Sequence, residues 1–135
     1  MEAVGWSQSY SVGIKEIDEQ HKKLISLLNV LVSATMGPVE EDGIGKILRE
    51  LVNYTVYHFN TEEKYMEGFN FPGFEEHRKE HEYFKIKVAE FIEKYDKGDA
   101  KVTVDLLEFL WSWVKEHIRG MDKKYTGCFL EHGVK

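Results

Sequence analysis

The chain has 135 residues, of which 42% are apolar and 31% are charged, as expected for one soluble globular domain. Its net charge of −6 disfavours nucleic acid and anionic membrane surfaces as partners, because both select for clustered lysine and arginine. No apolar stretch approaches the roughly 20 residues that span a bilayer, and the first residues lack the features of a secretory signal, so we expect no membrane insertion. The single cysteine, Cys128, excludes an internal disulfide and fits a reducing, cytoplasmic location.

Four helices are predicted from apolar residues that recur at spacings of three and four. Residues 1–17 show no such period and are expected to form an extended arm against the core. Asp18 is the expected N-cap of the first helix, and Gly37 and Pro38 end it. The predicted helices lie at about 18–36, 43–67, 74–97 and 102–121, and residues 123–135 form a C-terminal tail that folds back or frays.

No segment shows the strict alternation of apolar and polar residues that is typical of a β-strand. Amphipathic helices of about 20 residues that are joined by short connections pack as antiparallel neighbours. The predicted fold class is therefore all-α. We expect a single domain, residues 1–135, with an antiparallel up-down-up-down four-helix bundle and an extended N-terminal arm.

Five of the six histidines lie on the apolar faces of these helices, and they are His21, His58, His77, His81 and His117. Residues four apart share a helix face, which pairs His58 with Glu62 and His77 with His81. Because adjacent helices run in opposite directions, the starts of the first and third helices meet the ends of the second and fourth. All five imidazoles, together with Glu62 and Asp122, are therefore expected at one end of the bundle.

This cluster predicts a metal site. A single histidine on an apolar face is more often an ordinary core residue that is hydrogen-bonded to a neighbour. Five imidazoles and two carboxylates buried at one level would be costly without a common partner. Nitrogen ligands with a minority of carboxylates suit iron, copper, nickel or zinc better than magnesium or calcium, and five imidazoles are too many for one tetrahedral zinc.

Two metals bridged by Glu62 and Asp122 would use every group in the cluster. If each metal takes about six ligands, the imidazole nitrogens, the carboxylate oxygens and one bridging oxo or hydroxo group fall one ligand short of filling both. One metal therefore keeps an open position.

The spacing of His117 and Asp122 does not fit a regular helix. Residues five apart differ by about 140° around the axis, so both cannot point inward from one regular turn. We expect a π-bulge or a loosened last turn near Gly120, where the backbone is freest.

Taken together, these motifs resemble the hemerythrin family in its single-domain bacterial and archaeal form, and the resemblance covers essentially the whole chain. The residues that carry it are Trp6, Ser11-Val12-Gly13-Ile14, Ile17-Asp18-Glu19-Gln20-His21, His58 with Glu62, His77 with His81, and His117 with Asp122 followed by Lys123-Lys124-Tyr125.

The resemblance implies a non-haem centre of two iron ions with an oxo or hydroxo bridge, which binds dioxygen reversibly for oxygen carriage, storage or delivery. An oxygen-consuming enzyme is a candidate recipient. By similarity, one iron would be coordinatively full, the other would hold the open position, and Glu62 and Asp122 would bridge them. The full iron would be held by His77, His81 and His117, and the open one by His21 and His58.

Aliphatic and aromatic side chains one turn from these ligands are candidates for a dry pocket over the open position. Plain core packing explains each of them equally well. The candidates are Leu24, Phe59, Trp113, Val114 and Ile118.

Two other functions compete with oxygen binding. A di-iron oxidase or peroxidase, or an enzyme that handles peroxide or nitric oxide, is one alternative. Ferritin-like di-iron sites carry more carboxylates and Glu-x-x-His pairs, which this set of histidines lacks, so we expect a binding protein and not an enzyme. An oxygen sensor is the other alternative, but sensors of this kind are usually fused to an output domain, for which the chain is too short.

Overall fold

The computed structural model of the chain describes residues 6–36, 43–98, 102–120 and 122–134. Four long helices make up the fold, and the described part contains no strand. They are α1 (Lys15–Met36), α2 (Gly43–Gly68), α3 (Phe74–Asp96) and α4 (Val102–Arg119). Two 3-10 helices, η1 (Gln8–Tyr10) and η2 (Asp122–Tyr125), and a short helix, α5 (Thr126–Glu131), complete the structure.

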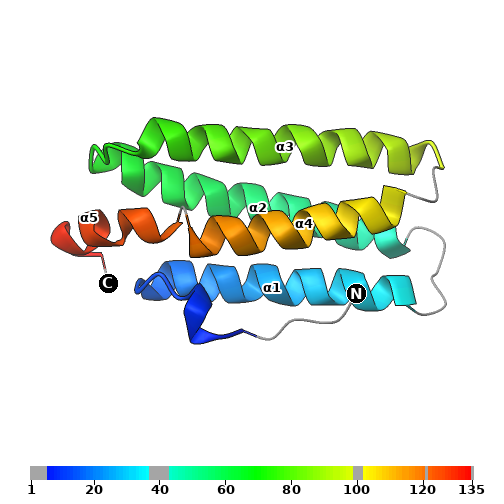
Figure 1. Cartoon of the computed structure of the whole chain (residues 1–135), viewed down its shortest axis with the longest axis horizontal. Coiled ribbons are helices and arrows are strands. Elements are labelled where there is room, and N and C mark those ends of the chain that lie inside the picture. The colour runs from blue at the N-terminus through cyan, green and yellow to red at the C-terminus, as the bar shows by residue number, and fades with distance from the viewer. Residues whose placement is uncertain (1–5, 37–42, 99–101, 121, 135) are drawn as a thin grey trace.

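The long helices run antiparallel to their neighbours in chain order, and α1 closes the bundle by packing against both α2 and α4 (Figure 1). This confirms the predicted all-α four-helix bundle. Of the helices that the structure describes, none combines the length and the apolar character that crossing a bilayer requires.

The start of α1 differs from the prediction. The helix begins at Lys15, because the Asp18 N–H donates to the Ile14 carbonyl (2.8 Å) and closes the first turn three residues earlier than expected. Asp18 is therefore inside the helix and is not its N-cap. Its carboxylate instead accepts hydrogen bonds from the Val12 N–H (2.8 Å) and the Ser11 hydroxyl (2.6 Å), which ties the arm to the helix. The arm itself is not wholly extended, since it contains η1.

The end of α4 also differs from a regular helix. The helix ends at Arg119 and not near residue 121, and the Gly120 N–H makes the last helical contact, to the Glu116 carbonyl (2.9 Å). Asp122 then opens η2. The predicted loosened turn near Gly120 is confirmed, whereas the described residues contain no π-bulge.

The C-terminal tail folds back as an ordered element and does not fray. Tyr125 and Phe129 have no solvent exposure, and they form a second small core with residues from the arm, from α1 and from the end of α2. In Figure 1, α5 lies at the left end of the bundle, beyond the end of α4. The Thr126 hydroxyl donates to the Val12 carbonyl (2.6 Å) and fastens α5 to the arm.

Candidate metal centre

All seven predicted ligand residues meet inside the bundle, and none is more than 5% exposed. Their side-chain donor atoms form two groups, and within each group the atoms all lie within 4.8 Å of one another. The three-histidine group consists of Glu62, His77, His81, His117 and Asp122. The two-histidine group consists of His21, His58, Glu62 and Asp122.

Asp122 faces both groups with different oxygens. Its Oδ1 lies 2.8 Å from His77 Nε2 and 3.0 Å from His117 Nε2, both in the three-histidine group. Its Oδ2 lies 3.0 Å from His21 Nε2, in the two-histidine group. This is the arrangement that a carboxylate needs in order to bridge two cations.

Glu62 is the second shared carboxylate. Its Oε1 lies 3.1 Å from His58 Nε2 in one group and 3.5 Å from His81 Nε2 in the other. The two members of each pair, His58–Glu62 on α2 and His77–His81 on α3, are four residues apart, so one face of each helix supplies both members. The break after α4 lets Asp122 turn inward beside His117, which a continuous helix would prevent.

Several of these buried atoms have no hydrogen-bond partner among the described residues. Burying an unsatisfied polar atom costs about 1–3 kcal/mol, and such atoms are rare in proteins. Three of them are the Nδ1 atoms of His21, His77 and His117, and the other five are potential metal donors of the two ligand groups. They include Nε2 of His21 and His77, Oε1 of Glu62 and both carboxylate oxygens of Asp122. The donor set therefore fits a pair of cations.

The charges of the cluster are strongly coupled. Burial alone would raise the pKa of Glu62 and of Asp122, but contacts with the surrounding histidines outweigh it and hold both pKa values well below the usual range. Burial opposes the charged form of His81, yet its contacts with the carboxylates of Glu62 and Glu63 raise its pKa to about 9. Both carboxylates are therefore ionised at neutral pH, and His81 must give up a proton before its Nε2 can bind a cation.

Three outer contacts orient the ligands, and the sequence analysis missed them. The Nδ1–H of His58 donates to Gln20 Oε1 (2.6 Å), and the Nδ1–H of His81 donates to Glu63 Oε2 (2.9 Å). In each case the other ring nitrogen, Nε2, faces the centre, as second-shell partners of metal-binding histidines require. Gln20 precedes His21 and Glu63 follows Glu62, so the search for an Nδ1 acceptor among the ligands' neighbours could have found both.

The third contact comes from Tyr125, whose hydroxyl donates to Glu62 Oε2 (2.5 Å). Burial and the charges of Glu62 and Asp122 raise the pKa of Tyr125 well above its usual value, so the phenol stays a donor. The sequence analysis placed Tyr125 in the C-terminal tail and therefore did not predict that its hydroxyl binds Glu62.

Four of the five candidate pocket residues are buried in the main core, and the fifth, Trp113, is partly buried and packs against it. Leu24, Val114 and Ile118 are at most 5% exposed. The ring of Phe59 is stacked on His81 (centroids 3.7 Å apart), and the ring of Trp113 is stacked on His117 (4.3 Å). Both rings therefore contact ligands of the three-histidine group, and the ring of Phe59 also lies 6.1 Å from that of His58 in the two-histidine group. A dry pocket over the open position stays a prediction.

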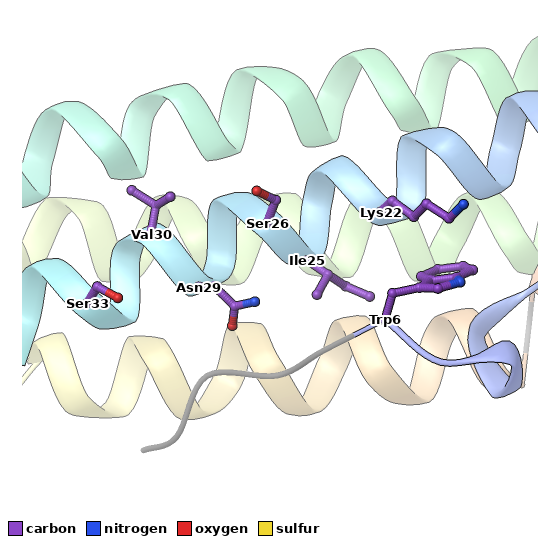
Figure 2. A pocket seen from close by; sticks show the side chains of 7 residues that line it. All are labelled: Trp6, Lys22, Ile25, Ser26, Asn29, Val30 and Ser33. Carbon is purple, nitrogen blue, oxygen red and sulfur yellow. The ribbon is translucent and has the colours of Figure 1, made fainter.

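A surface groove of about 440 Å³ lies elsewhere, on the outer face of α1 beside the arm (Figure 2). Lys22 lies over the ring of Trp6 at one end of it, 5.4 Å from the ring centroid. None of the residues lining the groove is a candidate ligand, so it is separate from the metal centre.

A histidine-rich pair of cation sites with shared carboxylates, inside a four-helix bundle, defines a two-metal binding protein. The family model described as the hemerythrin HHE cation binding domain matches residues 12–128. The chain belongs to the hemerythrin family.

Individual relatives match over nearly the whole chain. The bacteriohemerythrin of Stenotrophomonas maltophilia (strain R551-3) is 34% identical over 127 residues, which cover 94% of this chain and 82% of that protein. The hemerythrin-like protein of Naegleria gruberi is 33% identical over 122 residues, or 90% of each chain. A crystal structure of wild-type hemerythrin superposes with a TM-score of 0.86 at 29% identity, covering 94% of this chain and 98% of that one.

Proposed function

We propose that this centre holds two iron ions and binds dioxygen reversibly at one of them. The observation that carries the proposal is the inequality of the two groups, which share Glu62 and Asp122 but have three imidazoles on one side and two on the other. With equal coordination numbers, the iron of the two-histidine group would have one position fewer filled by protein. That position is where a small ligand would bind.

His77, His81 and His117 would hold the first iron, His21 and His58 the second, and the two carboxylates would bridge them. When bound, the iron pair supplies the electrons that dioxygen takes up on binding and returns on release. The protein's own contribution is to hold the donors rigidly and to keep water away, since every ligand is at most 5% exposed. The Nδ1 contacts of His58 and His81 fix the tautomers that present Nε2 to the metals.

The names of the relatives support this function, because they are hemerythrins and bacteriohemerythrins. We infer further that the role is binding and not turnover, so that the oxygen is carried, stored or passed to an oxygen-consuming enzyme. The preponderance of imidazole over carboxylate supports this inference, since the carboxylate-rich, Glu-x-x-His sites of ferritin-like proteins are the ones built for oxidation. The free thiol of Cys128 supports a cytoplasmic location.

Metal and oxygen stoichiometry test the proposal. Metal-free protein titrated anaerobically with ferrous iron should bind two ions per chain, and the loaded protein should then take up one dioxygen per chain. Asp122→Ala should lose the paired site, because both groups depend on that carboxylate, while His132→Ala, on the exposed histidine outside the cluster, should bind normally. One iron per chain, or an unaffected Asp122→Ala variant, would contradict the proposal.

A further inference from the structure

We propose that the three-histidine group is also an electron port, and that electrons from a soluble one-electron donor reach its iron through contacting aromatic rings of η2, of α5 and of the residues that directly follow α2 and α5. The inference rests on the proposed di-iron function. An iron pair that gives electrons to dioxygen must start in the ferrous state. Any chain that loses those electrons therefore needs a route for reduction from outside.

The route can be followed ring by ring. The ring of Tyr125 lies against the ligand His77, with centroids 5.6 Å apart and planes at 27°. Phe129 stacks on Tyr125 at 4.3 Å and 6°. Phe69 meets Phe129 edge-on at 5.7 Å, and the exposed His132 stacks on Phe69 at 4.3 Å and 14°. We call Tyr125, Phe129, Phe69 and His132 the aromatic path.

A branch reaches the surface at a second point. Tyr65 contacts Phe129 at 5.4 Å and Phe69 at 5.8 Å, and its hydroxyl donates to the exposed carboxylate of Glu16 (2.8 Å). Tyr125 and Phe129 themselves have no solvent exposure. The path therefore spans the distance from a fully buried ligand to solvent-accessible rings without a break in ring contact.

The two-histidine group has fewer and longer ring contacts to the rest of the bundle. Within the described residues, the ring contacts of His21 and His58 are with each other and, for His58, with Phe59 at 6.1 Å and 47°. In contrast, each histidine of the three-histidine group has an aromatic ring stacked on it. The closest aromatic contacts therefore lie at the three-histidine group, whereas the small ligand would bind at the two-histidine group.

Electron tunnelling weakens exponentially with the gaps between groups, and closely stacked π systems keep those gaps short. The phenyl rings need not be oxidised to serve, because they act as a bridge. In each electron-transfer step, one electron leaves the donor and one ferric ion becomes ferrous. No bond forms or breaks, and each ring ends the step in the state in which it began.

Trp113 offers a competing route. Its ring is stacked on His117, and it is partly exposed. Beyond it, Phe84 leads to Phe109 and Tyr83 through longer ring contacts of 5.9 and 6.2 Å. A test must therefore compare the two routes directly.

The test measures how fast the oxidised, iron-loaded protein is reduced by photogenerated methyl viologen radical in anaerobic solution. Phe129→Leu should slow the reduction severalfold, and so should Phe69→Leu, which lies nearer the surface and disturbs the core less. Phe84→Leu is the matched control, a buried phenylalanine off the aromatic path, and should leave the rate unchanged. The reduction potential of the iron pair should be unchanged in all three variants, whereas a purely structural effect would shift it together with the rate.

Equal rates for Phe69→Leu, Phe129→Leu and the wild type would overturn the proposal, as would a loss of rate confined to Trp113→Leu. Dioxygen binding by the pre-reduced proteins is measured separately. If the variants bind oxygen normally but are reduced at the wild-type rate, the electron port alone fails. If no protein binds oxygen although reduction follows the aromatic path, the proposed oxygen function alone fails.

Discussion

Replacing Tyr125 with phenylalanine isolates a single hydrogen bond at the metal centre. The change removes the hydroxyl that donates to Glu62 Oε2 (2.5 Å) and leaves the ring stacked on Phe129. Both partners are fully buried, so the carboxylate oxygen cannot recruit a surface water in exchange. A hydrogen bond to a charged group contributes about 1.5–3 kcal/mol, and loss of a second-shell partner lowers metal affinity about 10–100-fold. The two ranges agree, since a factor of ten corresponds to about 1.4 kcal/mol.

The matched control is Tyr65→Phe. It makes the same chemical change to a partly exposed tyrosine, whose acceptor, Glu16, is exposed and can be solvated instead. We expect Tyr125→Phe to lower the affinity of the metal-free protein for ferrous iron in anaerobic titrations and to lower its urea midpoint, while Tyr65→Phe hardly changes either. If the two variants behave alike, Tyr125 does not orient Glu62, and the reasoning about the second shell is refuted.

Three further predictions concern protons and the arm. Because the pKa of His81 is raised to about 9 in the metal-free protein, iron binding at pH 7 should release a proton, and the apparent affinity for iron should rise with pH up to about 9. Calorimetry in buffers of different ionisation enthalpy measures the proton release, and an affinity independent of pH would contradict the prediction. Glu63→Gln keeps an acceptor for His81 Nδ1 but removes its charge, so the pKa of His81 should fall towards its ordinary value in an NMR titration; an unchanged pKa would show that the charge of Glu63 does not contribute to it. Asp18→Ala removes the acceptor for the Val12 N–H and the Ser11 hydroxyl and should lower the free energy of unfolding by about 1.5 kcal/mol, the lower end of the range for bonds to a charged group. A urea midpoint equal to that of the wild type would show that these hydrogen bonds between the arm and α1 do not stabilise the fold.

The bundle and its ligands could be predicted from the sequence because both follow from periodicity. The apolar spacing placed α2 and α3 within one residue at each end. The His58–Glu62 and His77–His81 pairs then had to share helix faces, and the antiparallel order had to bring them to one level. Even the irregular spacing of His117 and Asp122 carried information, because it required the break that the structure has after Arg119.

Contacts between segments far apart in the chain were not predictable in this way. The six residues of α5 are too few to show a helical period, so its burial against α1 and α2 left no signal. Tyr125 reaches Glu62 across 63 positions of sequence. The role of Asp18 was misjudged because the arm, and not the helix alone, decides what its carboxylate binds.

Reversible oxygenation is the central claim, and a visible absorption spectrum tests it most directly. The iron-loaded, reduced protein is recorded without air, after air is admitted, and again after the oxygen is removed. A charge-transfer band that appears with air and disappears on deoxygenation over several cycles is the predicted result. A band that never forms, or that decays to a spectrum that removing oxygen does not reverse, would contradict oxygen binding and favour an oxidase or a different metal.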